Sequence, residues 1–197
     1  MGEHPITDWV KATYTGEQLG EYTMSAVLHR TGEQQMRRFM EWVRPKIVVE
    51  TGTHHGIAAA LMAQYAERVY TFDPFDSDIK WAIWDHFGVA DKISYIKIKD
   101  DLDKASWLLE FQPWDFAFVD GMHNQGGYAV DFHLLSRCGR VLFHDAVPNA
   151  AEGNFRKQIY DFARECPWPT KILDNPFAYV AKAGVAPAPE TWNATAR

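Results

Sequence analysis

The sequence predicts an α/β domain in which a mostly parallel β-sheet lies between two layers of helices. Short runs rich in β-branched residues alternate with segments of helical spacing over most of the chain. Buried parallel strands are typically near-continuous apolar runs, and a crossover, usually a helix, separates each from the next. Two closing strands joined by a tight turn add a further prediction, an antiparallel hairpin at the end of the sheet.

The first helix is expected from Glu33 to Pro45. Its apolar residues recur on one face, as in a helix that covers a core; they are Met36, Phe39, Met40 and Val43. Pro45 ends the helix because the residue before a proline is pushed out of the helical conformation. Residues 1–32 form a polar, turn-prone N-terminal segment, in which Trp9 and Tyr14 are candidates for a substrate lid.

Alternating strands and helices follow. The strands are short apolar runs, expected at residues 46–50, 68–72, 92–98, 114–119 and 140–143. The segments between and after them have helical composition, at 57–65, 78–87, 102–111, 127–136 and 154–165. Ser77 or Asp78 is expected to cap the second of these helices, and Gly88 to end it. The closing strands, 171–173 and 177–181, meet at a turn at Asn175-Pro176, and residues 184–197 are expected to be a loose tail.

Composition and charge exclude several classes of function. The 197 residues make about one domain, and a net charge of −6 disfavours nucleic acid, because neutralising phosphates takes clustered Lys and Arg. No secretory signal begins the chain, and its longest apolar run, Ile57 to Ala63, is far shorter than the ~20 residues that span a bilayer. Cys138 and Cys166 match no metal or redox spacing. We expect a soluble cytoplasmic protein with no membrane or nucleic-acid partner.

The loop after the first strand is the first candidate for ligand binding. Sheets of this class bind ligands at the carboxyl ends of their strands, where the strand order reverses. The loop there is Glu50-Thr51-Gly52-Thr53-His54-His55-Gly56. Gly52 permits a tight turn and Gly56 close packing at the helix start. The glycine spacing is not that of a dinucleotide loop, and the Glu50 carboxylate would repel a phosphate. Alone, the loop is equally consistent with an ordinary strand-to-helix turn.

Acidic residues follow the next two strands. Asp73 comes about twenty residues after Gly52, where a carboxylate can accept the hydroxyls of a ribose. Asp101 follows the third strand, where an adenine edge can be recognised. Helix capping is the structural alternative for both residues, and it is stronger for Asp101 because a helix is expected from Leu102.

These motifs together resemble those of class I S-adenosylmethionine-dependent methyltransferases. Residues 48–56 resemble their first motif, and residues 115–123 and 138–145 resemble the fourth- and fifth-strand motifs of the small-molecule O-methyltransferase branch, with its catechol, caffeoyl-CoA and antibiotic-tailoring enzymes. The resemblance covers residues 33–183 and implies a three-layer, Rossmann-like fold that also ends in an antiparallel hairpin. It implies that the methyl donor S-adenosylmethionine is bound by Glu50, Gly52, Thr53, Gly56, Asp73, Asp101 and Asp120. The chain departs from the family at Cys138, where a glycine is usual, and at His54 and His55, which would crowd the donor's carboxyl end.

Asp120, His144 and Asp145 end two adjacent strands, so their side chains are expected to converge. The resemblance implies a divalent ion there; oxygen ligands favour Mg²⁺ or Mn²⁺, and an imidazole favours a transition metal. Without an ion, Asp120 would contact substrate or donor and Asp145 would cap a loop. His123 is the alternative catalyst, because a neutral imidazole can remove a hydroxyl proton, and His144 can take the same role.

The sequence therefore predicts an O-methyltransferase of a small hydroxylated acceptor, such as a phenol, a sugar or a natural-product intermediate. One alternative is a non-catalytic protein that keeps the nucleoside pocket as an interaction module. Another is an enzyme of the same fold that uses a ligand such as a nucleotide sugar, which the charge of Glu50 disfavours. The Met- and Phe-rich helix before the first strand is a candidate homodimer surface.

Overall fold

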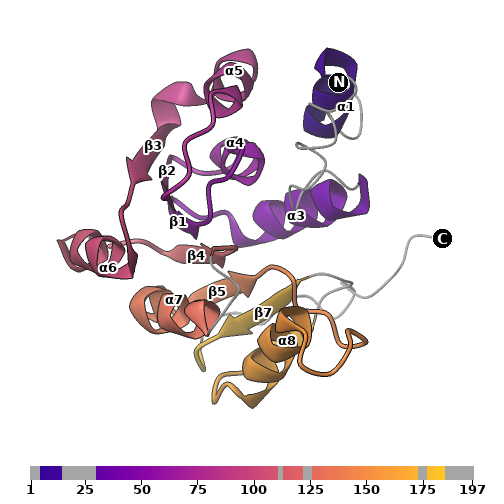
Figure 1. Ribbon diagram of the computed structural model, residues 1–197, viewed down its shortest axis with the longest axis vertical. Helices are drawn as coiled ribbons and strands as arrows, with labels where there is room; N and C mark the ends of the chain where they lie inside the picture. The colour runs from indigo at the N-terminus through magenta and orange to yellow at the C-terminus, as the bar shows by residue number, and fades with distance from the viewer. Residues whose placement is uncertain (1–4, 15–29, 111–112, 122–125, 173–176, 185–197) are drawn as a thin grey trace.

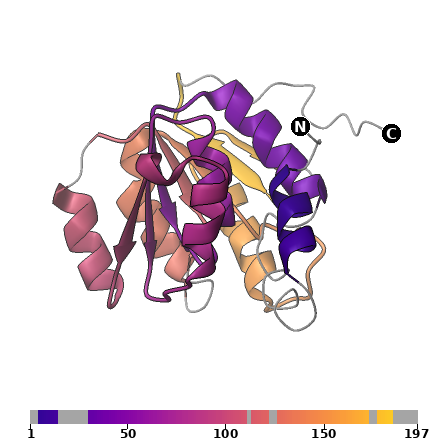
Figure 2. The same ribbon diagram turned by 90° about the horizontal axis from the view of Figure 1, so that it is seen from above.

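A computed structural model describes residues 5–14, 30–110, 113–121, 126–172 and 177–184. These residues form a seven-stranded sheet in the order β3-β2-β1-β4-β5-β7-β6, with helices on both faces (Figures 1 and 2). The predicted three-layer α/β fold is confirmed.

Five parallel strands make the body of the sheet, and β7 runs antiparallel to both of its neighbours. The strands are β1 Ile47–Thr51, β2 Arg68–Asp73, β3 Ile93–Lys97, β4 Phe116–Val119, β5 Arg140–Phe143, β6 Thr170–Ile172 and β7 Ala178–Ala181. From β1 the chain builds outward through β2 and β3 on one side and returns to β4 on the other. The strand order therefore reverses between β1 and β4, where sheets of this kind bind their ligands.

Helices cover the two faces of the sheet in two groups. One layer contains α1 Pro5–Thr13, α3 Arg30–Val43, α4 Ile57–Ala63 and α5 Ile79–His86. The other contains α6 Asp101–Glu110, α7 Gly127–Leu135 and α8 Phe155–Glu165. Single 3₁₀ turns at Ala90–Lys92 and Ser136–Cys138 precede β3 and β5. Within the described parts of the chain, none of the helices has the length and apolar character needed to cross a membrane.

The core explains why the strand runs are apolar throughout. Successive residues of a strand point to opposite faces, and here helices cover both faces. Val48 and Phe116 pack with the first helix layer, whereas Val49 and Ala117 pack with the second. Burying a side chain of this size contributes about 1.5–3 kcal/mol to stability.

The N-terminal segment differs from the prediction. Its described part forms α1, which lies beside α3 (Figures 1 and 2) and buries Ile6 and Val10. The carboxylate of Glu33 accepts hydrogen bonds from the backbone N–H groups of Ile6 (3.3 Å) and Thr7 (2.9 Å). These are donors that a helix start leaves unsatisfied, so Glu33 caps α1 from a distant part of the chain.

Helix α3 begins earlier than the predicted Glu33 and buries its apolar face. It begins at Arg30, so its first residues lie within the predicted N-terminal segment, residues 1–32. Its apolar face is fully used within the protein, since Met36, Phe39 and Met40 are at most 1% exposed. The Met and Phe side chains of the predicted dimer surface therefore pack in the core, and the homodimer stays a prediction.

Helix ends were predicted to within a few residues. Asn154 is the N-cap of α8, and its side chain accepts the N–H of Arg156. Asp78 precedes α5 but makes no capping hydrogen bond, and the Ser77 hydroxyl contacts His55 instead. The predicted turn at Asn175-Pro176 lies outside the described residues.

Candidate functional site

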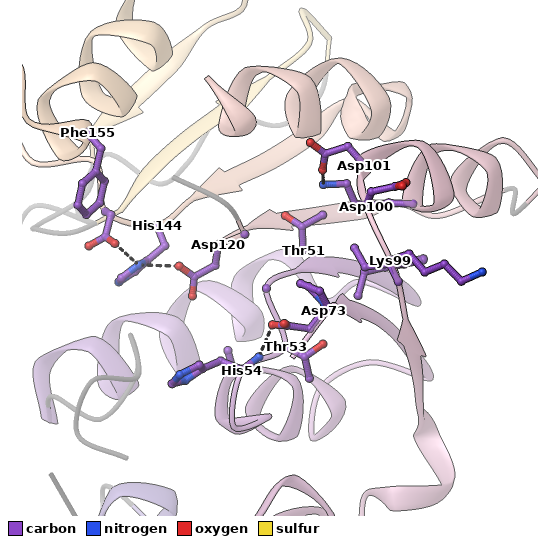
Figure 3. Close-up of a pocket in the computed structure, with 18 of the residues that line it drawn as sticks. Thr51, Thr53, His54, Asp73, Lys99, Asp100, Asp101, Asp120, His144 and Phe155 are labelled. Atoms are coloured by element: carbon purple, nitrogen blue, oxygen red, sulfur yellow. Dashed lines mark hydrogen bonds and ion pairs between the residues drawn. The ribbon is translucent and has the colours of Figure 1, made fainter. Parts of the chain in front are cut away.

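A pocket of about 520 Å³ lies at the carboxyl ends of the strands around the β1–β4 switch point. Its volume is within the range of about 300–1,000 Å³ of small-molecule sites. The predicted site residues that line it are Gly52, Thr53, Asp73, Asp101, Asp120, His144 and Asp145 (Figure 3). Strand ends that are far apart in the sequence thus meet in one cavity.

Gly52 brings the first loop against the end of β4. Its φ of +91° lies in the left-handed region, and a Cβ at this position would be 2.0 Å from the carbonyl oxygen of Asp120. Its N–H donates to the carbonyl of Phe72 (2.9 Å). Only glycine fits this approach, so the loop backbone can form the pocket wall between β1 and β4.

Gly56 has a different task from the predicted contact with the donor. A Cβ here would lie 2.7 Å from atoms of Lys80 and Trp84, and the Trp84 indole N–H donates to the Gly56 carbonyl (2.8 Å). Gly56 is not part of the pocket lining. Its small size seats α5 against the start of α4.

The side chain of Asp73 is held in place by backbone hydrogen bonds. Its two carboxylate oxygens accept the N–H groups of His54 and Phe75, each at 2.7 Å, and the residue is 8% exposed (Figure 3). An ionised carboxylate has about four lone-pair positions, so each oxygen can accept a further bond. Asp73 orders the loop rather than capping α5, and it lines the pocket.

Glu50 lies beneath the loop and does not line the pocket. It is fully buried, and its Oε2 accepts the hydroxyl of Thr71 (2.6 Å), which in turn lies 2.6 Å from the hydroxyl of Thr53. Burial raises the pKa of Glu50 well above its usual value, and the nearby Asp120 and Asp73 act in the same direction. The predicted direct contact with the donor is therefore corrected to support of the loop through Thr71 and Thr53.

After β3, the residue that caps α6 is Asp100, and the capping role considered for Asp101 is not observed. The Asp100 carboxylate accepts the N–H of Asp103 (2.9 Å) at the start of α6. Asp101 lines the pocket and pairs with Lys104 (2.8 Å), which also pairs with the buried Asp131 of α7. Lys104 is a pocket residue that sequence reasoning missed; its only signal is its position three residues after Asp101.

Asp120, His144 and Asp145 form a compact cluster on the other side of the pocket. One ligand atom from each lies within 4.8 Å of the others. His144 Nδ1 is 2.9 Å from Asp120 Oδ1 and 3.4 Å from Asp145 Oδ2 (Figure 3). The backbone N–H of His144 donates to the backbone carbonyl of Val119 (3.0 Å), so the end of β5 positions the imidazole next to the end of β4.

The electrostatic field of this cluster favours a positive charge. Burial alone would lower the pKa of His144, but Asp120 and, to a lesser degree, Asp145 raise it to about 10. A group with this pKa is protonated at neutral pH and does not accept a proton. The raised pKa argues against His144 as a base in the metal-free protein, and the role of His144 as a base stays a prediction. The other candidate base, His123, lies outside the described residues.

Two pocket residues have backbone conformations that are uncommon for residues other than glycine. His54 has a φ of 45° and Asp145 a φ of 58°. Such conformations cost about 1–3 kcal/mol and are frequent at functional sites. Two of the three described non-glycine residues with positive φ thus line the pocket, and the third, Arg44, follows α3.

The histidine pair and the aromatic residues of α1 are placed differently from expectation. His54 lines the pocket, whereas the buried His55 turns toward the Ser77 hydroxyl (2.8 Å), so only one of the two histidines faces the pocket. Trp9 stacks on His86 with ring centroids 4.5 Å apart. Neither Trp9 nor Tyr14 lines the pocket. Much of the predicted lid segment, residues 15–29, lies outside the described residues.

No protein-family model and no curated protein matches the sequence. Solved structures do match over most of the chain. A methyltransferase from Geobacter sulfurreducens is 17% identical, with a TM-score of 0.66 over 90% of this chain and 88% of that one. The O-methyltransferase from Bacillus cereus in complex with SAH is 13% identical, with a TM-score of 0.59 over 91% and 90%. An SAH-bound methyltransferase from Podospora anserina is 14% identical, with a TM-score of 0.61 over 91% and 87%.

Identities this low establish the architecture, and a fold by itself does not specify a reaction. The strand order and the antiparallel β7 agree with these matches. The protein has the fold of the class I methyltransferases.

Proposed function

We propose that this protein is an S-adenosylmethionine-dependent O-methyltransferase that acts on a small hydroxylated acceptor with the help of a divalent metal ion. The observation that carries the proposal is the division of the pocket. Residues suited to a nucleoside lie at the ends of β1, β2 and β3, and a His and Asp cluster that could hold a cation lies at the ends of β4 and β5. Asp120 stands where the two halves meet, beside Gly52 and His144.

The half of the pocket at the ends of β1, β2 and β3 is the proposed site of the methyl donor, and its side chains are held by hydrogen bonds. The Asp73 carboxylate would accept the ribose hydroxyls, Gly52 and Thr53 would provide a close backbone wall, and Asp101 would accept the amino group of adenine. SAH is bound in two structures of the same fold, which supports S-adenosylmethionine as the donor. The argument against a phosphate now rests on Asp73, since Glu50 is buried away from the pocket.

The residues of the other half fit a divalent metal ion. Asp120, His144 and Asp145 would hold it, since the field that raises the pKa of His144 would also stabilise a metal cation. The imidazole favours Mn²⁺ or another transition metal over Mg²⁺. When bound, such an ion lowers the pKa of an acceptor hydroxyl. His144 would have to lose its proton to become a ligand.

The remaining requirements for methyl transfer are alignment and exclusion of water. Alignment would be provided by pocket walls that Gly52, the hydrogen-bonded Asp73 and the start of α8 hold in place. His123 remains a proposed base for an acceptor that binds without metal. The absence of a nucleic-acid partner and a cytoplasmic location likewise stay predictions.

The first test is calorimetry with SAH on wild-type protein and on Asp73→Asn, with Asp85→Asn on the exposed side of α5 as the matched control. Hydrogen bonds to a charged group contribute about 1.5–3 kcal/mol, so Asp73→Asn is expected to weaken binding at least tenfold. Asp85→Asn should bind like wild type. Absence of SAH binding to the wild-type protein, or equal binding by Asp73→Asn, would contradict the proposal.

The same proteins separate the alternatives by turnover. Methyl transfer to a member of a panel of phenols and sugars is expected from wild type. SAH binding without transfer to any of them would favour the nucleoside-binding interaction module. Binding that depends on a diphosphate would favour the nucleotide-sugar enzyme.

A further inference from the structure

Arg156 brings a permanent positive charge to the half of the pocket that contains the metal-binding cluster. It is the second residue of α8 and lines the pocket next to Phe155. Its N–H donates to the Asn154 side chain (2.9 Å), and its carbonyl accepts the N–H of Val147 (3.2 Å). The backbone at Arg156 is therefore fixed relative to the cluster.

The guanidinium group is only partly used within the protein. Its Nε lies 3.1 Å from Asp145 Oδ1, and the side chain is 51% exposed. In the part of the chain that the structure describes, no group accepts a hydrogen bond from its two terminal nitrogens. A guanidinium has five donors in a planar fork that matches a carboxylate, so its outer edge is available to a ligand.

Phe155 provides an apolar wall next to this charge. The guanidinium carbon of Arg156 lies 5.6 Å from the centre of the Phe155 ring. Figure 3 shows Phe155 and His144 on the same side of the pocket, across from Asp101 and Lys99. A planar acceptor can pack against this ring while a substituent on it reaches Arg156.

The two lysines that line the pocket belong to its other half, at the ends of β1, β2 and β3. Lys104 is paired with Asp101 and Asp131, and Lys99 follows β3. Among the lining residues that are described, Arg156 is therefore the permanent cation of the acceptor half. A neutral phenol would leave the outer edge of this guanidinium without a partner.

We infer that Arg156 is a specificity-determining residue that binds the carboxylate of an aromatic hydroxy acid. The inference rests on the proposed function and names the acceptor class for that site. The acceptor would present its hydroxyl to the Asp120–His144–Asp145 cluster and its ring to Phe155. Its carboxylate would bind the outer edge of Arg156.

A pair of acceptors that differ in one carboxylate tests the inference. Binding of 3,4-dihydroxybenzoate and of catechol to the SAH- and Mn²⁺-loaded protein would be measured by calorimetry, on wild type, Arg156→Gln, Arg156→Lys and Arg164→Gln. Wild type should bind the carboxylate at least about tenfold more tightly, because hydrogen bonds between charged groups are the strong ones. Arg156→Gln should bring the ratio close to one, Arg156→Lys should keep part of it, and Arg164→Gln, which lies outside the pocket, should keep all of it.

Four results would overturn the inference. A wild-type ratio near one, or no binding of either compound, would show that the site does not select a carboxylate. An equal loss of both compounds in Arg156→Gln would mean that Arg156 only orients Asp145. A weaker affinity of Arg156→Gln for SAH would assign the guanidinium to the carboxylate of the donor. Because these are binding measurements, failure of the proposed methyl transfer is seen separately, as a lack of turnover by wild type.

Discussion

His144 has a strongly perturbed environment in the proposed metal site. Its imidazole is 7% exposed and lies between two carboxylates, which raise its pKa to about 10 against the effect of burial. A metal ion would therefore compete with a proton for the place between Asp120 and Asp145. Since a histidine ligand must be deprotonated, metal affinity should increase as pH rises.

The raised pKa also makes the stability of the metal-free protein depend on pH. The folded-state pKa of about 10 lies above the ordinary value of 6.5. The stabilisation is therefore complete below about pH 6.5 and is lost as pH rises toward 10. Chemical denaturation in a chelator should show a fall in the free energy of unfolding over this range, and His144→Asn should show a smaller fall. Equal slopes for both proteins would contradict the assignment.

At the residue scale, Asp73 and Glu50 show what the sequence could and could not predict. Both are carboxylates near the end of a β-branched run, and both were predicted to contact the donor. The strand β1 continues to Thr51, so Glu50 is a strand residue whose side chain points into a covered face. A strand boundary that moves by one residue turns a side chain from the pocket into the core, and boundaries are what local patterns determine least well.

At the scale of elements, α1 formed where the sequence indicated turns. Its cap, Glu33, lies 26 residues from Thr7 along the chain. A contact of this separation has no signature in a local window, whereas the start of α8 next to Asn154 was predicted from adjacent residues. Local sequence therefore predicted where α8 starts, but not the distant cap of α1.

Replacing Glu33 tests this view of α1. Glu33→Ala removes the acceptor of two backbone N–H groups and the partner of Arg37, so α1 should lose about 1–3 kcal/mol of local stability. Hydrogen exchange should accelerate at residues 5–13 and remain close to wild type in β1 and β4. Unchanged exchange in α1 would show that its apolar contacts alone hold it.

The loop after β1 can be tested with two glycine substitutions. Gly52→Ala places a Cβ 2.0 Å from the Asp120 carbonyl, so it must displace the end of β4 and should abolish SAH binding. Gly88 also has a positive φ, +62°, but a Cβ at this position would have no atom within 4 Å. Gly88→Ala should therefore lower the free energy of unfolding only by the ~1–2 kcal/mol of a left-handed residue, and SAH binding should remain intact. Equal binding by the two variants would contradict the proposed close approach.

At the scale of the whole molecule, the fold was predictable because each level of the sequence agrees with it. The apolar runs indicate the strands, the helical spacing indicates the helices that cover them, and the closing hairpin indicates the antiparallel end of the sheet. The topology then brings the strand ends together whatever their distance in sequence. Lys104, Phe155 and Arg156 were missed for the complementary reason. They come from helices, and nothing in a helical pattern shows that its first turns face a pocket.

The two halves of the pocket should respond separately to metal removal. The donor residues lie at the ends of β1 to β3, and the proposed metal ligands lie at the ends of β4 and β5. Chelation should therefore abolish methyl transfer while the affinity for SAH changes by no more than about threefold, well under 1.4 kcal/mol. Loss of both together would indicate that the ion is part of the donor site.

The most direct measurement is a crystal structure of the protein with SAH and Mn²⁺, using the anomalous signal of manganese. The proposal predicts the ribose hydroxyls on Asp73, the adenine near Asp101, and a manganese peak among Asp120, His144 and Asp145. SAH outside the strand-end pocket, or manganese bound elsewhere while these three residues keep only their mutual ion pairs, would contradict it.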